Sequence, residues 1–160
     1  MKEQLPTDTE IRAGYNALLA AAKLPFPEAH AEFTRIGMDG KLPIPAMPRA
    51  LVAFTRIQAQ LRSARVALAV SQYEQAHDEL PESLDVLAPD FLDIVPLDPF
   101  DEQPLRYRRE GKGFIVYSVG DNLVDDGGVR NLEMGFEPKR WADVGYSVGM
   151  PVAETAEEHR

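Results

Sequence analysis

Cysteine is absent from the 160-residue sequence, which excludes disulfide bonds, thiolate metal sites and cysteine nucleophiles. Long apolar runs are also absent. The longest, residues 17–22, falls far short of the ~20 residues that a membrane-spanning helix needs. The first six residues lack the apolar centre of a signal peptide. We therefore expect no membrane span and no targeting segment in the chain as written, which could equally be one piece of a longer protein.

Positive charge is scarce, with 17 basic against 26 acidic side chains and a net charge of −9. Nucleic acids and anionic membranes need a cationic surface, so this balance disfavours both as general partners. Hydrophobic residues make up 44% of the chain, which is enough for a globular core. The length suits one domain, or one domain plus an arm.

The first 45 residues are predicted to form a helical arm followed by a proline-rich linker. Asp8 is expected to cap a helix that runs to about Lys23. Its apolar residues share one face at helical spacing: Ile11, Tyr15, Leu18 and Ala22. A second short helix fits residues 28–36, and the prolines of segment 42–48 then indicate a stiff linker or turn.

The strongest helix signal runs from Arg49 to about His77. Apolar residues step along it by three and four and make one stripe: Leu51, Phe54, Ile57, Leu61, Ala64 and Leu68. The stripe resembles a heptad over about two and a half repeats, fewer than the three to four that indicate a coiled coil. We therefore interpret it as contact with the protein's own core. His77 near the helix end is interpreted as a residue compatible with the helix dipole.

Pro81 is expected to end this helix, and Ser83 to cap a short helix that reaches residue 88. Nine acidic residues and no Lys or Arg lie between positions 78 and 102, which is typical of a solvated loop face. A hairpin is predicted next, with strands at 105–109 and 114–118 around a glycine-containing turn. A third strand fits 144–148, and residues 151–160 are expected to be a tail.

Enzyme motifs are weak. Residues 145–149 match the G-x-S-x-G pattern of hydrolases around Ser147, but that motif needs a helix after the serine and both Asp and His later in the chain. Pro151 follows almost at once, and downstream there is only His159. The chain has two other histidines, His30 and His77, and no two of the three have the four-residue spacing that lets a helix bind zinc. We expect no enzyme activity.

The densest basic cluster surrounds Tyr107 and comprises Arg106, Arg108, Arg109 and Lys112. Binding of RNA or DNA through this strand is one interpretation. The other is an outward strand face whose cations pair with the acidic residues just upstream. The overall negative charge favours the second interpretation.

The segment 118–128 combines three aspartates, an asparagine, a serine and several glycines. Calcium is a hard cation that takes six to eight oxygen ligands, and such a loop can supply carboxylate, hydroxyl and carbonyl oxygens. An EF-hand is excluded because Leu132 stands where the bidentate glutamate should be. Composition alone leaves open whether the segment is a calcium site or a plain turn.

Three segments in order resemble the C-terminal domain of type II secretion major pseudopilins. Segment 73–84 places a Pro and a Ser-started turn after an aromatic helix residue. Asp98-Pro99-Phe100 and then 104–108 resemble that family's Asp-Pro-aromatic turn and first strand. Segment 117–120, followed by Asp and Gly, resembles its second strand and calcium loop. The closest resemblance is to large, uncharacterised bacterial proteins that end in this module.

This resemblance implies a pilin-like α+β fold, a long helix on a three- or four-stranded antiparallel sheet, spanning residues 46–150. It implies no catalysis, and a calcium ion held by Ser118, Asp121, Asp125 and Asp126 with backbone carbonyls. The segment before Leu51 departs from the family, which begins with an apolar anchor, and the family's remaining calcium ligands would have to come from residues 129–133. The expected function is a structural or interaction module. An adaptor that binds a protein through the arm and the long helix, or self-association, stays open. If a membrane anchor precedes this sequence, we expect the protein in the cell envelope. If none does, we expect it in the cytoplasm.

Overall fold

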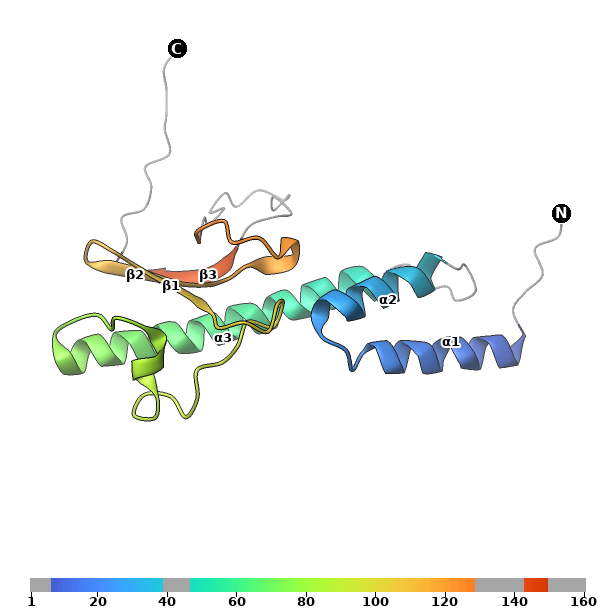
Figure 1. Ribbon diagram of the computed structural model, residues 1–160, viewed down its shortest axis with the longest axis horizontal. Helices are drawn as coiled ribbons and strands as arrows, with labels where there is room; N and C mark the ends of the chain where they lie inside the picture. The colour runs from blue at the N-terminus through green and yellow to red at the C-terminus, as the bar shows by residue number, and fades with distance from the viewer. Residues whose placement is uncertain (1–6, 39–46, 129–142, 150–160) are drawn as a thin grey trace, which may run out of the picture.

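The structure of the chain is a computed structural model, which describes residues 7–38, 47–128 and 143–149. Figure 1 shows a long helix with a small sheet on one side and two shorter helices at one end. The predicted α+β class and the antiparallel sheet are confirmed, and the sheet has three strands in the described part of the chain. Most of the predicted linker, the segment 129–133 and the tail from Pro151 lie outside the described residues.

Helix α1 spans Asp8–Ala21 and begins one residue earlier than a cap at Asp8 predicts. The capping residue is Thr7, whose hydroxyl accepts a hydrogen bond from the Glu10 amide, while the Glu10 carboxylate accepts one from the Thr7 amide at 2.9 Å. This reciprocal capping box satisfies two backbone donors, whereas Asp8 lies in the first turn. The prediction of Asp8 as the cap was therefore wrong by one position.

Helix α2 spans Phe26–Met38 and packs against both α1 and the long helix. Helices α1 and α2 share a small core, against which Leu51 of the long helix packs; its buried residues are Leu18, Ala21, Ala29, Phe33 and Ile36. At the start of α2, Phe26 packs edge-on against Phe100, with ring centroids 4.6 Å apart. Phe100 belongs to the loop that precedes the sheet, so the arm contacts the part of the molecule that carries the strands.

Helix α3 spans Met47–His77, close to the predicted bounds, and packs on strands β2 and β3. The side chains that it buries are mostly small: Thr55, Ala59, Ser63, Val66, Ala67, Ala69 and Val70. Short side chains let the helix backbone approach the sheet closely, and dispersion contacts then form along the whole interface. We call this side the inner face of α3.

The predicted apolar stripe lies on the opposite side of α3, which we call the outer face. Phe54 is 60% exposed, Ile57 54%, and Leu61 and Leu68 each 67%. The prediction that these residues contact the core was therefore wrong. The sheet packs on the small residues instead, because large side chains there would hold it away from the helix. Leu51 differs from the rest of the stripe and packs, half-buried, against the α1–α2 core.

The sheet has the order β1-β2-β3 and is antiparallel throughout. Its strands are β1 (Arg106–Glu110), β2 (Gly113–Ser118) and β3 (Val144–Val148), each within one residue of its predicted bounds. Strand β2 is central and buried along its whole length. The β1–β2 turn contains Gly111, whose φ of +58° is a left-handed conformation that glycine adopts readily.

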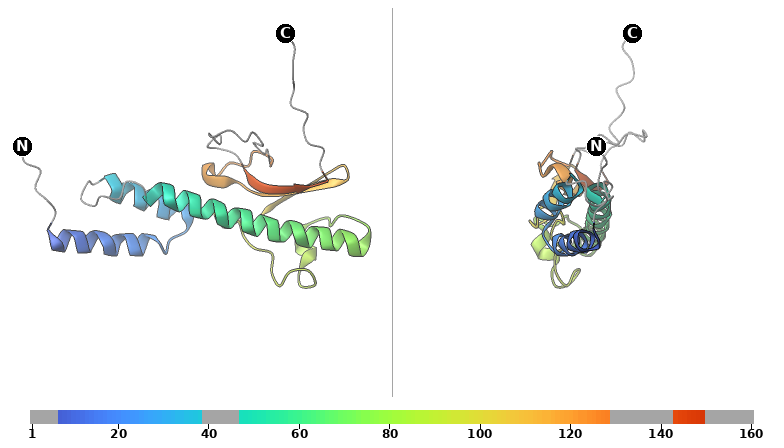
Figure 2. Two further views of the ribbon diagram at one scale, coloured as in Figure 1. Left: turned by 180° about the vertical axis from the view of Figure 1, so that it is seen from behind. Right: turned by 90° about the vertical axis from the view of Figure 1, so that its right-hand side faces the viewer.

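The segment between α3 and β1 runs below α3 in Figure 1 and in the reverse view of Figure 2, while the sheet lies above the helix. It contains the short 3-10 helix η1 (Leu84–Leu87), where Ser83 occupies the N-cap position without a side-chain cap bond. Leu87, Val70 and Phe114 meet in the main core, so this segment, α3 and the sheet are packed together. None of the helices in the described ranges is long and apolar enough to cross a membrane.

Candidate functional site

A buried carboxylate anchors the loop before the sheet to the end of β2. Asp98 has no solvent exposure. Its Oδ1 accepts hydrogen bonds from the Phe100 amide (2.9 Å) and the Ser118 hydroxyl (2.8 Å), and its Oδ2 from the Val119 amide (2.9 Å) and Arg106 Nη1 (3.2 Å). The prediction of a solvated acidic face is therefore wrong at Asp98. The sequence signal that could have distinguished Asp98 from the exposed acidic residues is the Asp-Pro-aromatic turn to which it belongs.

Ser118, the first predicted calcium ligand, faces this anchor. Its hydroxyl donates to Asp98 and accepts a hydrogen bond from the Gly120 amide at 3.1 Å, and the residue is fully buried. Both bonds keep the hydroxyl turned toward the core. Ser118 therefore has a structural partner in the arrangement described, away from the surface of the Asp-rich loop.

Asp121, the second predicted ligand, is paired with the long helix. It follows Gly120 in the short 3-10 helix η2 (Gly120–Asn122). Its Oδ1 accepts a hydrogen bond from Arg56 Nε at 2.9 Å and also contacts Arg56 Nη2. Both side chains are largely shielded from solvent, so this charge-assisted pair links α3 to the end of the sheet.

Asp125 and Asp126, the remaining predicted ligands, are exposed and lie beside Asp143, which precedes β3. The Asp125 carboxylate accepts hydrogen bonds from the Tyr117 hydroxyl and the Gly127 amide, both at 2.9 Å. Asp143 accepts one from the Gly128 amide at 2.6 Å. Asp143 was not predicted, because 14 residues outside the described ranges separate it in sequence from the loop and only strand pairing brings it near.

The carboxylates of Asp125, Asp126 and Asp143 lie close together, and this affects the pKa of Asp143. Burial raises the pKa of Asp143, the amides of Gly128 and Asp126 lower it, and the nearby charges of Asp126 and Asp125 raise it further, with a net upward shift. Burial and the hydrogen bond to Asp125 raise the pKa of Tyr117 to about 12. The phenol therefore stays protonated at neutral pH and acts as a hydrogen-bond donor.

The structure thus divides the four predicted ligands into two groups. Ser118 and Asp121 hold the end of β2 to the loop and the helix, whereas Asp125 and Asp126 lie at the surface with Asp143. Within residues 7–38, 47–128 and 143–149, no three His, Asp or Glu side chains are grouped so that they could hold a metal ion. The oxygen-rich corner at Asp125, Asp126 and Asp143 has the donor chemistry that calcium prefers, but not a complete shell of side chains.

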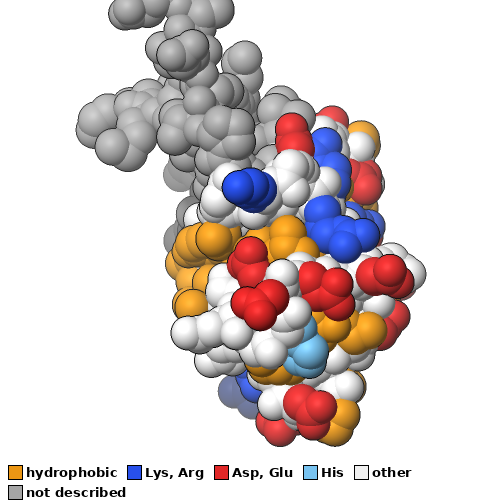
Figure 3. Space-filling model, turned by 90° about the vertical axis from the view of Figure 1, so that its left-hand side faces the viewer, with side chains coloured by type: hydrophobic (Ala, Val, Ile, Leu, Met, Phe, Trp, Pro, Cys, Tyr) orange, Lys and Arg blue, Asp and Glu red, His pale blue; other side chains and the backbone are white. Residues whose placement is uncertain are grey.

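The basic cluster on the hairpin lies next to acidic residues. Arg106 contacts both Asp98 and Asp101, with 2.5 Å between Arg106 Nη2 and Asp101 Oδ2. Arg108 pairs with Glu110 at 3.1 Å. In Figure 3, basic side chains gather directly beside acidic ones at this end of the molecule. The pairing of Arg106 with upstream acids is therefore confirmed, and the cations do not form a separate positive field in this view.

The G-x-S-x-G segment is part of the sheet. Ser147 lies within β3 opposite Ile115, and not at the sharp turn from strand to helix that a nucleophile requires. A Cβ atom at Gly145 would lie 2.3 Å from the Val116 carbonyl oxygen. This glycine is therefore explained by the close approach of two strands.

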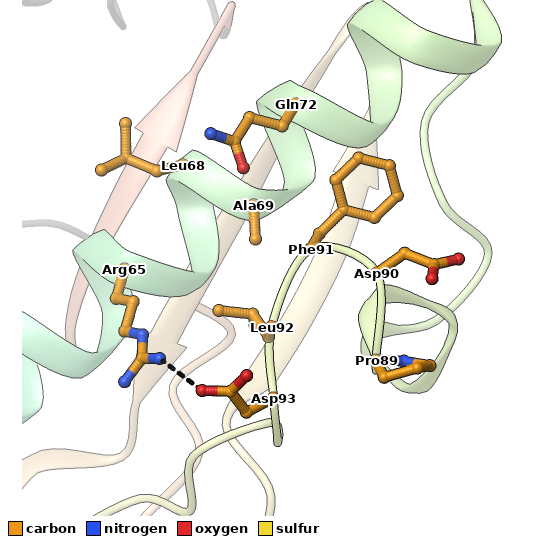
Figure 4. Close-up of a pocket in the computed structure, with 9 residues that line it drawn as sticks. All are labelled: Arg65, Leu68, Ala69, Gln72, Pro89, Asp90, Phe91, Leu92 and Asp93. Atoms are coloured by element: carbon orange, nitrogen blue, oxygen red, sulfur yellow. Dashed lines mark ion pairs between the residues drawn. The ribbon is translucent and has the colours of Figure 1, made fainter.

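The outer face of α3 exposes several large apolar side chains, and a groove lies beside it. The groove has a volume of about 350 Å³ and lies between α3, at Arg65, Leu68, Ala69 and Gln72, and the loop 89–93. Figure 4 shows Arg65 and Asp93 on its two sides, joined by an ion pair whose N–O distance is 3.9 Å. An exposed apolar helix face bordered by a groove is suited to contact with another protein.

The chain was compared with protein-family models, curated proteins and solved structures, and none of them matches it.

Proposed function

We propose that this chain is a non-enzymatic structural or interaction module, related in kind to the soluble part of a type II secretion pseudopilin. The observation that carries the proposal is the outer face of α3. Four large apolar side chains stand on that face over half exposed, while the inner face already packs on the sheet. A helix that is apolar on both sides is normally covered on both sides.

The energetics favour a partner on the outer face. Apolar surface removed from water contributes roughly 25 cal/mol per Å², so covering one such side chain contributes on the order of 1–2 kcal/mol. Phe54, Ile57, Leu61 and Leu68 lie on one line along the helix, so a single partner surface can cover all of them. A patch of this kind on a protein surface marks an interaction site more often than a scattered set does.

The relation to pseudopilins is supported by the way two of the resembling motifs meet. Asp98 of the Asp-Pro-aromatic turn bonds to Ser118 and Val119 of the second strand's end. The same carboxylate accepts a hydrogen bond from Arg106 of the first strand. These two motifs therefore form one connected structural unit next to the Asp-rich loop.

Site-specific photo-cross-linking in the cells that encode the protein tests the interaction function. A photoreactive phenylalanine analogue is placed at Phe54 or at Leu61, and at Ile94 as a matched control. Ile94 is 75% exposed and lies on the loop below α3. We expect adducts of defined mass from the two α3 positions and none from the control. Absence of adducts from both α3 positions would remove the proposal.

We also propose that calcium stabilises the Asp-rich loop. The support for this is the closeness of Asp125 and Asp126 to Asp143, whose pKa their negative charges raise, because a divalent cation would offset that repulsion. When bound, the ion would be held by the carboxylates of Asp125 and Asp126 with backbone carbonyls, and it would supply charge neutralisation and no catalysis. Thermal melts with calcium, with magnesium and with a chelator test this. An unchanged Tm across the three conditions would contradict it, and Asp126→Asn should abolish any calcium-dependent shift.

An adaptor function that also uses the arm is favoured by one observation. Tyr15 and Leu19 of α1 are 54% and 65% exposed, although the other side of α1 packs on α2. A photoreactive group at Tyr15 that captured the same adduct as one at Leu61 would support a joint surface. Capture from α3 alone would leave the arm as a structural support.

A further inference from the structure

We infer that the outer face of α3 is the seam of an antiparallel two-helix coiled coil between two copies of this chain. The inference rests on the proposed interaction function and names the partner. It depends on three features of the described residues: the spacing of the exposed side chains, their sizes, and the charges beside them.

The spacing is that of a heptad seam longer than the sequence alone suggests. Once Leu51 is assigned to the α1–α2 core, the outer face begins at Met47, which is 36% exposed, and Ala50, which is also exposed. The apolar residues then alternate strictly by three and four: Met47, Ala50, Phe54, Ile57, Leu61, Ala64 and Leu68. They fill seven consecutive a and d positions, about 32 Å of helix, and reach the three heptads that a coiled coil needs.

The sizes of these side chains favour an antiparallel pair. Reversing one helix places each a position opposite a d position of the other copy. About a two-fold axis near residue 59, Phe54 then faces Ala64 of the second copy, and Leu68 faces Ala50. Every such layer combines a large side chain with a small one, or Ile57 with Leu61, so the layers have similar thickness. A parallel pair would set Phe54 against Phe54 and Ala64 against Ala64, alternating crowded layers with voids.

The charges beside the seam do not oppose this pairing. The positions that flank it are mainly neutral, including Gln58, Gln60 and Gln72. Arg65 is the basic flanking residue, and antiparallel packing separates the two copies of Arg65 by roughly 18 Å along the helix. Arg56 and Arg62 are directed elsewhere, to Asp121 and to the Leu97 carbonyl. Like-charge repulsion, which would disfavour self-association, is therefore small.

The area is sufficient for a specific dimer. The five exposed large side chains of the seam present roughly 500 Å² per copy, so two copies would bury on the order of 1,000 Å² through them alone, near the lower bound of specific interfaces. The sheet packs on the inner face of α3. Phe54, Ile57, Leu61 and Leu68 of the seam are each over half exposed in the part of the chain that the structure describes.

Sedimentation equilibrium of the full chain tests the inference. We expect a monomer–dimer equilibrium, and at least a tenfold weaker association for Leu61→Lys, which places a charge at the centre of the seam. Ile94→Lys is the matched control, since it changes an apolar residue of comparable exposure, 75% against 67% for Leu61, that lies on the loop between α3 and β1. Leu61 is on the surface of the single chain, so its substitution should leave the circular dichroism unchanged. A wild-type chain that stays monomeric at millimolar concentration overturns the inference.

The absence of native cysteine allows the orientation to be tested with single cysteines and a short thiol cross-linker. Gln60→Cys lies near the two-fold axis and should form covalent dimers. Gln72→Cys should not, because antiparallel packing puts its two copies roughly 40 Å apart. Cross-linking at both positions would indicate a parallel pair and overturn the antiparallel arrangement.

The two proposals fail in distinguishable ways. If the purified chain is monomeric but Phe54 and Leu61 capture a different protein in cells, the dimer is wrong and the interaction function stands. If the chain is monomeric and neither position captures a partner, both proposals fall.

Discussion

The inner face of α3 buries small side chains against a sheet, whereas the outer face exposes large ones to solvent. Ala59 and Ser63 have no exposure, while Phe54 and Leu61 are at least 60% exposed, although all four lie within three turns of one helix. By hydropathy alone the outer face would be the buried one. The comparison teaches that close approach between a helix and a sheet selects short side chains, and that the larger ones remain available for contacts outside the fold.

The largest effect should come from removing the anchor that holds the sheet end in place. Asp98→Asn replaces an acceptor oxygen with an NH₂ group that would face the Val119 amide and Arg106. We expect unfolding free energy to fall by about 3 kcal/mol, because buried donors lose their partner. Urea denaturation measures this. Asp93→Asn, at an exposed aspartate, is the control and should change stability by less than about 0.5 kcal/mol.

Adding volume to the inner face should break its packing. Ala59→Leu inserts three carbon atoms where α3 meets the core formed with Phe26, Phe100 and Val119. We expect a loss of about 2 kcal/mol, since the backbone must move to accommodate them. Ala76→Leu, at an exposed position of the same helix, should be nearly neutral. Equal effects of the two substitutions in thermal melts would mean that the inner face is not tightly packed.

Acid should weaken the ion pair between Asp101 and Arg106, which lies at the start of β1. Partial burial acts to raise the pKa of Asp101, but hydrogen bonds from Arg106 and Gln103 outweigh it, so the pKa lies below its ordinary 3.8. The pair therefore stabilises the fold above the unfolded pKa, and this contribution is lost as the pH falls through the folded pKa. We expect less than about 1 kcal/mol. Asp101→Asn should flatten the wild-type decline in Tm below pH 4, and a decline of unchanged slope would contradict the assignment.

The smallest effect is expected at an unpaired hydroxyl on the inner face. Ser63 Oγ is buried without a hydrogen-bond partner in the described structure. Ser63→Ala removes the cost of keeping it from water, and should raise unfolding free energy by about 0.5–1 kcal/mol. A destabilised Ser63→Ala protein in the same urea assay would show that the hydroxyl has a partner after all.

Much of the fold followed from local patterns. The three helices, the hairpin and the third strand were predicted within a few residues, because each has a period, a capping residue or a turn glycine that acts over short distances. The N-cap was misplaced because Thr7 and Asp8 are both good capping residues, and only the reciprocal bond with Glu10 distinguishes them. Local sequence signals were therefore sufficient to predict the helices and strands, but not to predict which of their faces are in contact.

The candidate sites were predicted less well, for a physical reason. Ser118 and Asp121 have ligand chemistry in sequence, but Asp98 and Arg56, far away in the chain, engage them in the fold. Asp143 joins Asp125 and Asp126 only through the pairing of β3 with β2. Tertiary contacts decide which polar groups form hydrogen bonds with one another. The spacing of residues along the chain does not reveal these partners.

The sequence by itself determined that α3 is a long helix with an apolar heptad stripe, because helical period and side-chain chemistry are local. Only the tertiary structure decided which side of that helix is buried. The sheet and the helix gain most from close contact, and that contact forms on the small residues around Ala59 and Ser63. The stripe that looked like core was thereby left on the outside, where its spacing suits a second helix.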